Sequence, residues 1–179
     1  MPEGDTETTD DFLSARCPDR EVLRDLRKTK QANERYRDPA KAVADGFIAS
    51  PVCSMTPFGA RGYQYVHPAR FGDTAPLPHD LTKPQLLLYV PGKNGKLELA
   101  AVSFMQYIYQ DGAPYRGDEQ HPPNPASIPP TPVLYKQSFA GPMAGHFIGQ
   151  PWHFDITAWL WVDNPSGLFA LGNPAVTCP

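Results

Sequence analysis

The sequence predicts a mainly β (α+β) fold, a small antiparallel β-barrel or rolled sheet with one or two N-terminal helices. The 179-residue chain contains 22 prolines and 14 glycines, which together predict many turns, short strands and little long helix. The longest stretches with strand character lie at 97–109 and 151–161. A hydrophobic content of 41% and a charged content of 20% are ordinary for one folded domain with a real core.

The charge and hydropathy of the chain exclude several classes of partner. A net charge of −3 and a pI of about 5.9 give no electrostatic footprint for nucleic acid. No apolar run approaches the ~20 residues that a membrane-crossing helix needs. The acidic start of the chain has no apolar signal segment, so we expect a cytoplasmic protein. Secretion is the alternative if a leader has been removed.

The N-terminal part is expected to be helical after a disordered tail. Residues 1–18 are acidic and turn-rich, which predicts disorder, and 19–179 form a single β-rich domain. Residues 19–36 have an apolar stripe at helical spacing behind an Asp cap. Because Lys30 and Asn33 interrupt that stripe, we expect the helix to be half exposed.

A second, short helix is predicted between Asp38 and Gly46. Asp38 can cap it, Pro39 suits its first position, and Gly46 suits the left-handed residue that ends a helix. The residues expected to face the core are Ala40, Val43 and Ala44.

The rest of the chain reads as strands joined by loops. Residues 56–62 are predicted to be a loop, and an Asn-Gly turn within 91–96 predicts a hairpin between its flanking strands. The Pro-rich segment 110–132 is either a lid over a pocket or a tolerated excursion. Strands are predicted at 47–53, 62–67, 85–90, 97–109, 133–139 and 151–161.

The last of these strands carries the candidate site. Side chains alternate between the two faces of a strand. The first face is a plain core face: Trp152, Phe154, Ile156, Ala158 and Leu160. The other face combines an imidazole, a carboxylate, a hydroxyl and two indoles, as a pocket lining does: His153, Asp155, Thr157, Trp159 and Trp161.

His153 and Asp155 are the leading catalytic candidates, with His146 as a second proton or oxyanion contact. A carboxylate beside an imidazole orients it and raises its pKa, which suits a general acid or base near neutral pH. Alternatively, His146, His153 and Asp155, with His67 in reserve, could bind iron, zinc or copper. The third interpretation is an ordinary structural role for both residues.

The pocket itself is predicted from hydroxyl, thioether and aromatic side chains near this strand. His146 lies in a glycine-flanked loop, and the neighbouring Phe147 suggests a hydrophobic lining. His79 and His121, in Pro-rich loops, are expected to be exposed. The expected substrate-binding residues are Phe147, Ser103, Met105, Thr157, Trp159, Trp161 and Tyr65.

The three cysteines leave two interpretations open. There is no Cys-x-x-Cys pair, so a zinc knuckle is not indicated. Either Cys17, Cys53 and Cys178 are all reduced, as in a cytosolic protein, or Cys53 and Cys178 form a disulfide.

Several segments resemble a family of small, mostly uncharacterised bacterial proteins, many of which are exported. The segments are YRDPAKAVADGF (36–47), PQLLLYV (84–90), GPMAGHFIGQPWHFD (141–155), WLWVDNPSGLFA (159–170) and NPAVTC (173–178). The resemblance implies a metal site of His and carboxylate ligands. His146, His153 and Asp155 match the family pattern. The family has an acid, a Glu and a His where this chain has Phe147, Ser103 and Thr157.

The leading functional hypothesis is an enzyme that acts on a small, largely apolar molecule inside the barrel. Its chemistry would be cofactor-free acid–base or ring-forming catalysis of the cyclase, isomerase or lyase type, as in secondary metabolism. The alternatives are a metal-binding protein and a non-catalytic small-ligand-binding protein. A homodimer is left open.

Overall fold

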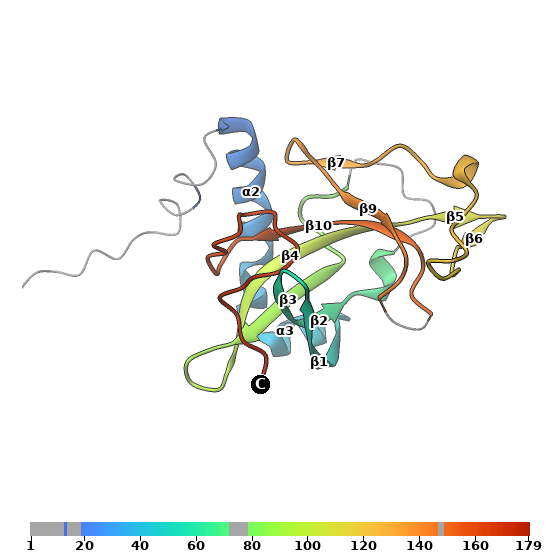
Figure 1. Ribbon diagram of the computed structural model, residues 1–179. Coiled ribbons are helices and arrows are strands. Elements are labelled where there is room, and N and C mark those ends of the chain that lie inside the picture. The colour runs from blue at the N-terminus through green and yellow to red at the C-terminus, as the bar shows by residue number, and fades with distance from the viewer. Residues whose placement is uncertain (1–12, 14–18, 72–78, 147–148) are drawn as a thin grey trace, which may run out of the picture.

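The computed structural model describes residues 13, 19–71, 79–146 and 149–179 (Figure 1). Its centre is a six-stranded antiparallel sheet of order β1-β2-β3-β4-β10-β9, curled into half a barrel. This confirms the predicted mainly β fold. The strands of the sheet are β1 Ile48–Thr56, β2 Gly59–Val66, β3 Leu86–Pro91, β4 Leu97–Tyr107, β9 Ala140–Met143 and β10 His153–Trp159.

Shorter elements surround this sheet. Two small hairpins pair β5 with β6 and β7 with β8. Their strands are β5 Tyr109–Gln110, β6 Ala113–Pro114, β7 Val133–Leu134 and β8 Gln137–Ser138. The helices are α2 Arg20–Asn33 and α3 Pro39–Ala44, with short 3₁₀ turns η1 Glu34–Arg37, η2 Pro68–Arg70 and η3 Pro125–Ser127.

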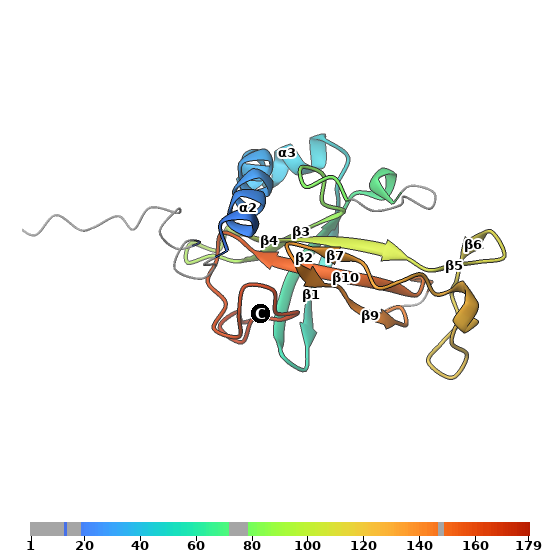
Figure 2. The ribbon, with the colours of Figure 1, turned by 90° about the horizontal axis from the view of Figure 1, so that it is seen from above.

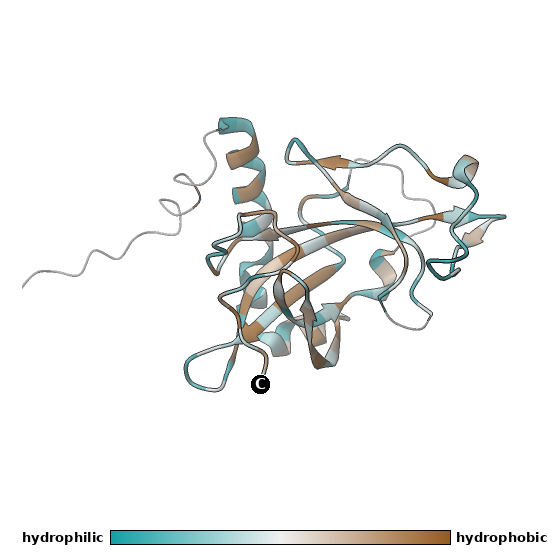
Figure 3. Ribbon diagram, in the orientation of Figure 1, coloured by the Kyte–Doolittle hydropathy of each residue, from teal (hydrophilic) through white to brown (hydrophobic). Residues whose placement is uncertain are grey.

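Helix α2 covers one face of the sheet. Figure 2 shows α2 and α3 on one side of the sheet and the C-terminal segment on the other. The Asp19 carboxylate caps the helix by accepting hydrogen bonds from the N–H groups of Glu21 and Val22, as the sequence predicts. The apolar stripe of α2 then packs on the main core cluster, which the central strands β3 and β4 help to form (Figure 3).

The expected half-exposed face of α2 is wrong at its two polar positions. Lys30 and Asn33 are both buried. The Asn33 side chain donates to the Thr29 carbonyl oxygen at 2.8 Å, and the Lys30 ammonium lies 5.9 Å from the centre of the Trp161 ring. Local hydrogen bonding and ring contact therefore let polar side chains sit where the stripe predicts exposure. Leu13 is also buried in the core, although the sequence predicts disorder for residues 1–18. The other residues of 1–18 lie outside the described part of the chain.

The short helix α3 begins and ends as predicted, but it buries a different side. Asp38 accepts from the Ala40 N–H, and Gly46 has a φ of +102°. A Cβ at Gly46 would lie 3.3 Å from the His67 ring, so the turn also needs the small residue. The core residue is Ala42, whereas Val43 is 53% exposed. Six residues give less than two turns, which is too few for periodicity to fix the buried face. The other two residues expected in the core, Ala40 and Ala44, are exposed.

Two predicted element types are corrected. The expected loop 56–62 contains only the turn of the β1–β2 hairpin, because β2 already begins at Gly59. The expected strand 133–139 is instead the β7–β8 hairpin. Tyr135 and Lys136 both have a φ near +55°, a left-handed conformation that reverses the chain.

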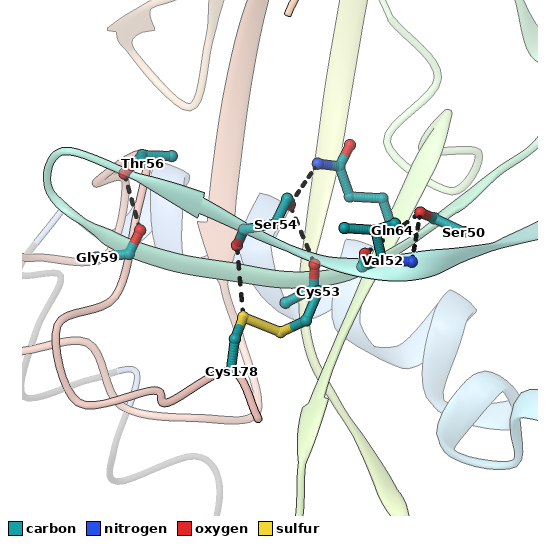
Figure 4. The surroundings of a disulfide bond; sticks show 9 residues. Ser50, Val52, Cys53, Ser54, Thr56, Gly59, Gln64 and Cys178 are labelled. Atoms are coloured by element: carbon teal, nitrogen blue, oxygen red, sulfur yellow. Dashed lines mark hydrogen bonds between the residues drawn. A yellow bond between two sulfur atoms is a disulfide. The ribbon is translucent and has the colours of Figure 1, made fainter. Parts of the chain in front are cut away.

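The C-terminal segment is fastened to the β1–β2 hairpin. Ala60 and Asn173 exchange two backbone hydrogen bonds, and a disulfide joins Cys53 to Cys178, whose Cα atoms are 5.6 Å apart. Figure 4 shows the bridge between β1 and the chain end. The disulfide alternative is therefore the correct one; Cys17 lies outside the described residues. Within these ranges, no helix combines the length and hydrophobicity that crossing a bilayer requires.

Candidate functional site

The alternation predicted for β10 is confirmed. Phe154, Ile156 and Ala158 belong to the main core beneath α2. The opposite face carries His153 and Asp155, with Thr157 and Trp159 further along the strand. All four of these side chains are fully buried.

Arg61 of β2 joins this polar face from across the sheet. Its Nη1 lies 2.8 Å from Oδ2 of Asp155, and their side chains are only 8% and 0% exposed. Its Nη2 donates to the Thr157 hydroxyl at 3.2 Å and to the Ser103 hydroxyl at 3.4 Å. One guanidinium therefore ties β2 to β4 and β10. Burying such a pair costs desolvation free energy. Removing one partner is therefore expected to lower the free energy of unfolding far more than removing both.

Sequence reasoning missed Arg61 because it assigned this residue to a loop. A signal was nevertheless present in the charge balance. Asp155 sits in a strongly apolar strand, and no Lys or Arg follows Lys136. A buried carboxylate needs a charged partner or a proton, so a cation from an earlier strand was required.

His153 is held by the backbone rather than by Asp155. Its Nδ1 lies 2.9 Å from the Pro151 carbonyl oxygen, which can only accept, so Nδ1 carries the proton. Its Nε2 therefore presents a lone pair. The expected orientation by Asp155 is wrong, because that carboxylate binds Arg61. The expected raised pKa is also wrong: burial of the imidazole lowers the pKa of His153 and outweighs the attraction of the nearby carboxylate.

Two buried acceptor atoms are left without partners in this site. Within the described part of the chain, neither Nε2 of His153 nor Oδ1 of Asp155 makes a hydrogen bond. Orphaned buried polar atoms are uncommon, and they are typical of sites that receive a ligand or water.

His146 lies between this buried site and the protein surface. Its ring meets the ring of His153 edge to face, with 5.1 Å between their centres. Its backbone N–H donates to the side-chain Oε1 of Gln150 at 2.7 Å, which fixes the loop after β9. Partial burial of the ring lowers the pKa of His146, so the imidazole is neutral at neutral pH.

A hollow of about 280 Å³ adjoins these residues. Arg61 and His146 line it, and each also contacts the fully buried pair: Arg61 binds Asp155, and His146 touches His153. Most of the remaining lining comes from the tip of the β1–β2 hairpin and from methionines. These residues are Ser54, Met55, Thr56, Pro57, Phe58, Gln64, Met105, Met143, Gln150 and Leu171.

A second, shallower groove of about 550 Å³ shares His146 and Gln150 with the hollow. Residues 116–120, from the Pro-rich segment, form one of its walls. The Pro-rich segment thus lines this groove and not the hollow.

Of the other predicted pocket residues, only some lie near the hollow. Met105 lines it, and the hydroxyls of Ser103 and Thr157 hold Arg61. Trp159 shares their face but packs in a separate cluster with Leu88 and Val90, and its indole N–H donates to the Ala170 carbonyl. Phe147 lies outside the described residues.

Three predicted site residues lie on the helix side of the sheet, which is a correction. The indole N–H of Trp161 donates to the Glu34 carboxylate, because β10 ends at Trp159 and alternation stops there. Tyr65 packs on Tyr89 in the main core. The His67 Nε2 donates to the Asp45 carbonyl oxygen at 2.9 Å and its ring packs on Phe47 of the main core, and among the described residues it is not gathered with His146 and His153 as a reserve metal ligand.

The two histidines expected in exposed loops differ. His121 is exposed, as predicted. The imidazole of His79 stacks on Phe139 with 5.2 Å between ring centres, and burial lowers its pKa. The prediction of an exposed His79 is therefore wrong.

Across the described residues, no three His, Cys, Asp or Glu side chains gather closely enough to form a metal site. Comparison with known proteins adds no assignment: no family model matches the chain, and no curated protein or solved structure matches it significantly. The functional argument therefore rests on the site itself.

Proposed function

We propose that this protein binds a small, largely apolar molecule in the hollow and transforms it by cofactor-free proton transfer. The observation that carries the proposal is the connection between hollow and buried site. His146 and Arg61 face the hollow, while behind them His153 and Asp155 keep unpartnered acceptor atoms. The reaction type that fits is an isomerisation, which needs no second substrate.

The chemistry follows from the neutral state of His146. A neutral imidazole can take a proton from one atom of the ligand and return it to another, so the ligand's composition is unchanged. The thioethers and the hairpin tip give the ligand a largely apolar lining beside His146. His146 is the catalytic residue in this proposal because it lines the hollow. His153, which is fully buried, is a positioning residue that supports the ring of His146.

Proton exchange with solvent tests this proposal directly. The probe is isophorone, a neutral cyclic enone with acidic C–H groups, incubated with the protein in deuterium oxide and followed by proton NMR. We expect exchange faster than in buffer, reduced at least tenfold by His146→Ala and unchanged by His121→Ala, since His121 lies in an exposed loop. A rate equal to that of heat-denatured protein would contradict catalysis. Binding without exchange would indicate the non-catalytic binding protein.

Metal binding is a second candidate function, favoured by the setting of His153. Metal-ligating histidines usually donate their other ring N–H to a carbonyl or carboxylate, as Nδ1 of His153 does to Pro151. With His146 in ring contact, two imidazoles lie side by side. Metal analysis of protein purified without a histidine tag separates the candidates. Stoichiometric iron, zinc or copper that is lost on His153→Ala would replace the cofactor-free proposal.

The compartment that fits the molecule best is an oxidising one. The Cys53–Cys178 disulfide supports the exported alternative over the cytoplasmic expectation, because reducing compartments keep thiols reduced. Alkylation of free thiols in intact cells, followed by mass spectrometry, tests this. Alkylated Cys53 and Cys178 would favour the cytoplasm.

A further inference from the structure

The hollow is balanced in charge. Arg61 is the only cationic side chain among its described lining residues, and Asp155 neutralises it from below at 2.8 Å. No carboxylate belongs to that same lining. An anionic or cationic ligand would therefore enter without a counter-charge and would lose its hydration. The occupant that fits is uncharged.

The polar atoms that remain available around the hollow include acceptors on two lining side chains, beside the unpartnered buried Nε–H of Arg61. The hydroxyl of Ser54 donates a hydrogen bond to the Gly62 carbonyl oxygen, and the hydroxyl of Thr56 donates one to the Gly59 carbonyl oxygen. Because Ser54 already donates, it must accept from Nε2 of Gln64, which fixes the orientation of that amide.

Two lining residues therefore keep acceptor capacity. The amide oxygen of Gln64 is left without a hydrogen bond within the described residues, and so is the imidazole of His146. Both ends of the Gln150 amide are used, one by the His146 N–H and one by the sulfur of Met105. The hollow thus suits a ligand whose polar group can donate a hydrogen bond to Gln64 or His146 and can also accept one, as a hydroxyl does.

The apolar part of the lining is soft and polarisable. Every methionine after Met1, namely Met55, Met105 and Met143, lines this hollow, together with the ring of Phe58. Met105 and Met143 lie directly across from Asp155 and His153 in the strand pairing, so they flank the buried site from both sides. Thioethers make favourable contacts with aromatic rings and adapt to their shape.

From these three features we propose that the ligand is an uncharged aromatic compound that carries a hydroxyl group, of the phenol class. This inference rests on the proposed function, because it names the kind of molecule that the same hollow takes. A volume of about 280 Å³ is at the small end of ligand pockets, which suits one or two rings. The hydroxyl donates to Gln64 or His146, and the ring lies among the methionines.

A matched set of four para-substituted ethylbenzenes tests the proposal by NMR titration at pH 7. They are para-ethylphenol, its methyl ether, para-ethylbenzoate and para-ethylbenzylammonium. The phenol is expected to bind at least fivefold more tightly than the ether, the effect of about one hydrogen bond. It is expected to bind at least tenfold more tightly than either ion. The double variant Gln64→Leu with His146→Phe should bring the phenol-to-ether ratio near one. His121→Ala should keep the ratio, because His121 does not line the hollow.

The outcomes separate this inference from the proposed function. Equal affinity for phenol and ether, or tighter binding of either ion, overturns the phenol assignment, and isophorone exchange would then still support catalysis. A failure of all four compounds to bind overturns the assignment as well. A phenol preference without isophorone exchange supports the assignment and leaves the hollow as a binding site. Met143→Ala should weaken all neutral rings alike, which a hydroxyl-only contact would not produce.

Discussion

The buried Arg61–Asp155 pair gives the sharpest test of how the candidate site is held together. Asp155→Ala would leave a guanidinium inside the sheet with only the hydroxyls of Thr157 and Ser103 as partners. With side chains 8% and 0% exposed and 2.8 Å between the charged atoms, solvent reaches the guanidinium only from the hollow and replaces little of the lost partner. We expect a loss of about 3–5 kcal/mol in the free energy of unfolding.

The double variant decides whether the cost arises from the unpaired charge. Arg61→Met alone should cost about as much as Asp155→Ala, because it leaves the buried carboxylate without its charged partner. Combining Arg61→Met with Asp155→Leu removes both charges, and we expect its cost to stay within about 2 kcal/mol. Independent effects would instead add to about 6–10 kcal/mol.

Urea unfolding of the oxidised protein, followed by tryptophan fluorescence and far-UV circular dichroism, measures these differences. Lys136→Met is the control, because Lys136 makes exposed ion pairs with Asp19 and Glu21 at similar distances of 2.9 and 2.8 Å. With the Lys136 and Asp19 side chains 54% and 43% exposed, that pair is well solvated, so Lys136→Met should change the free energy of unfolding little. Single costs at Arg61 and Asp155 as small as the control, or a double cost equal to their sum, would refute the reasoning.

Three further predictions concern the rest of the molecule. Cys178→Ser should lower the free energy of unfolding by about 5 kcal/mol in the loop-entropy model, because the disulfide closes a loop of 125 residues. In denaturant titrations, the oxidised and reduced wild-type proteins should differ by a similar amount. A variant as stable as the oxidised protein would contradict this. Burial lowers the pKa of His79, so the unfolded state binds a proton more readily, and stability should be complete above about pH 6.5 and fall below it. In melting curves measured from pH 7.5 to 5, His79→Phe should lose less stability with falling pH than the wild-type protein. An unchanged dependence of stability on pH would count against the burial of His79. Gly59→Ala should destabilise the protein far more than Gly95→Ala. Both glycines have a positive φ, but only at Gly59 would the new Cβ lie 2.4 Å from a backbone atom, the carbonyl carbon of Asn173. Equal thermal shifts for the two variants would show that the close approach is not needed.

Features that depend on neighbouring residues along the chain could be predicted from the sequence. The caps at Asp19 and Asp38 and the left-handed Gly46 follow from local hydrogen bonding and backbone sterics. The alternation that puts His153 and Asp155 on one face of β10 follows from the pleat of a strand. The sequence alone therefore determined the fold class, most elements and the residue pair around which the site is built.

Only the tertiary structure decided what surrounds that pair. Arg61 is 94 residues away from Asp155, and strand order and sheet curl bring the two together. The end of β10 at Trp159 sends Trp161 to the opposite face, and the backbone at Pro151 takes the role expected of Asp155 toward His153. These contacts join distant segments, and their geometry is set by packing and register, which no local pattern encodes.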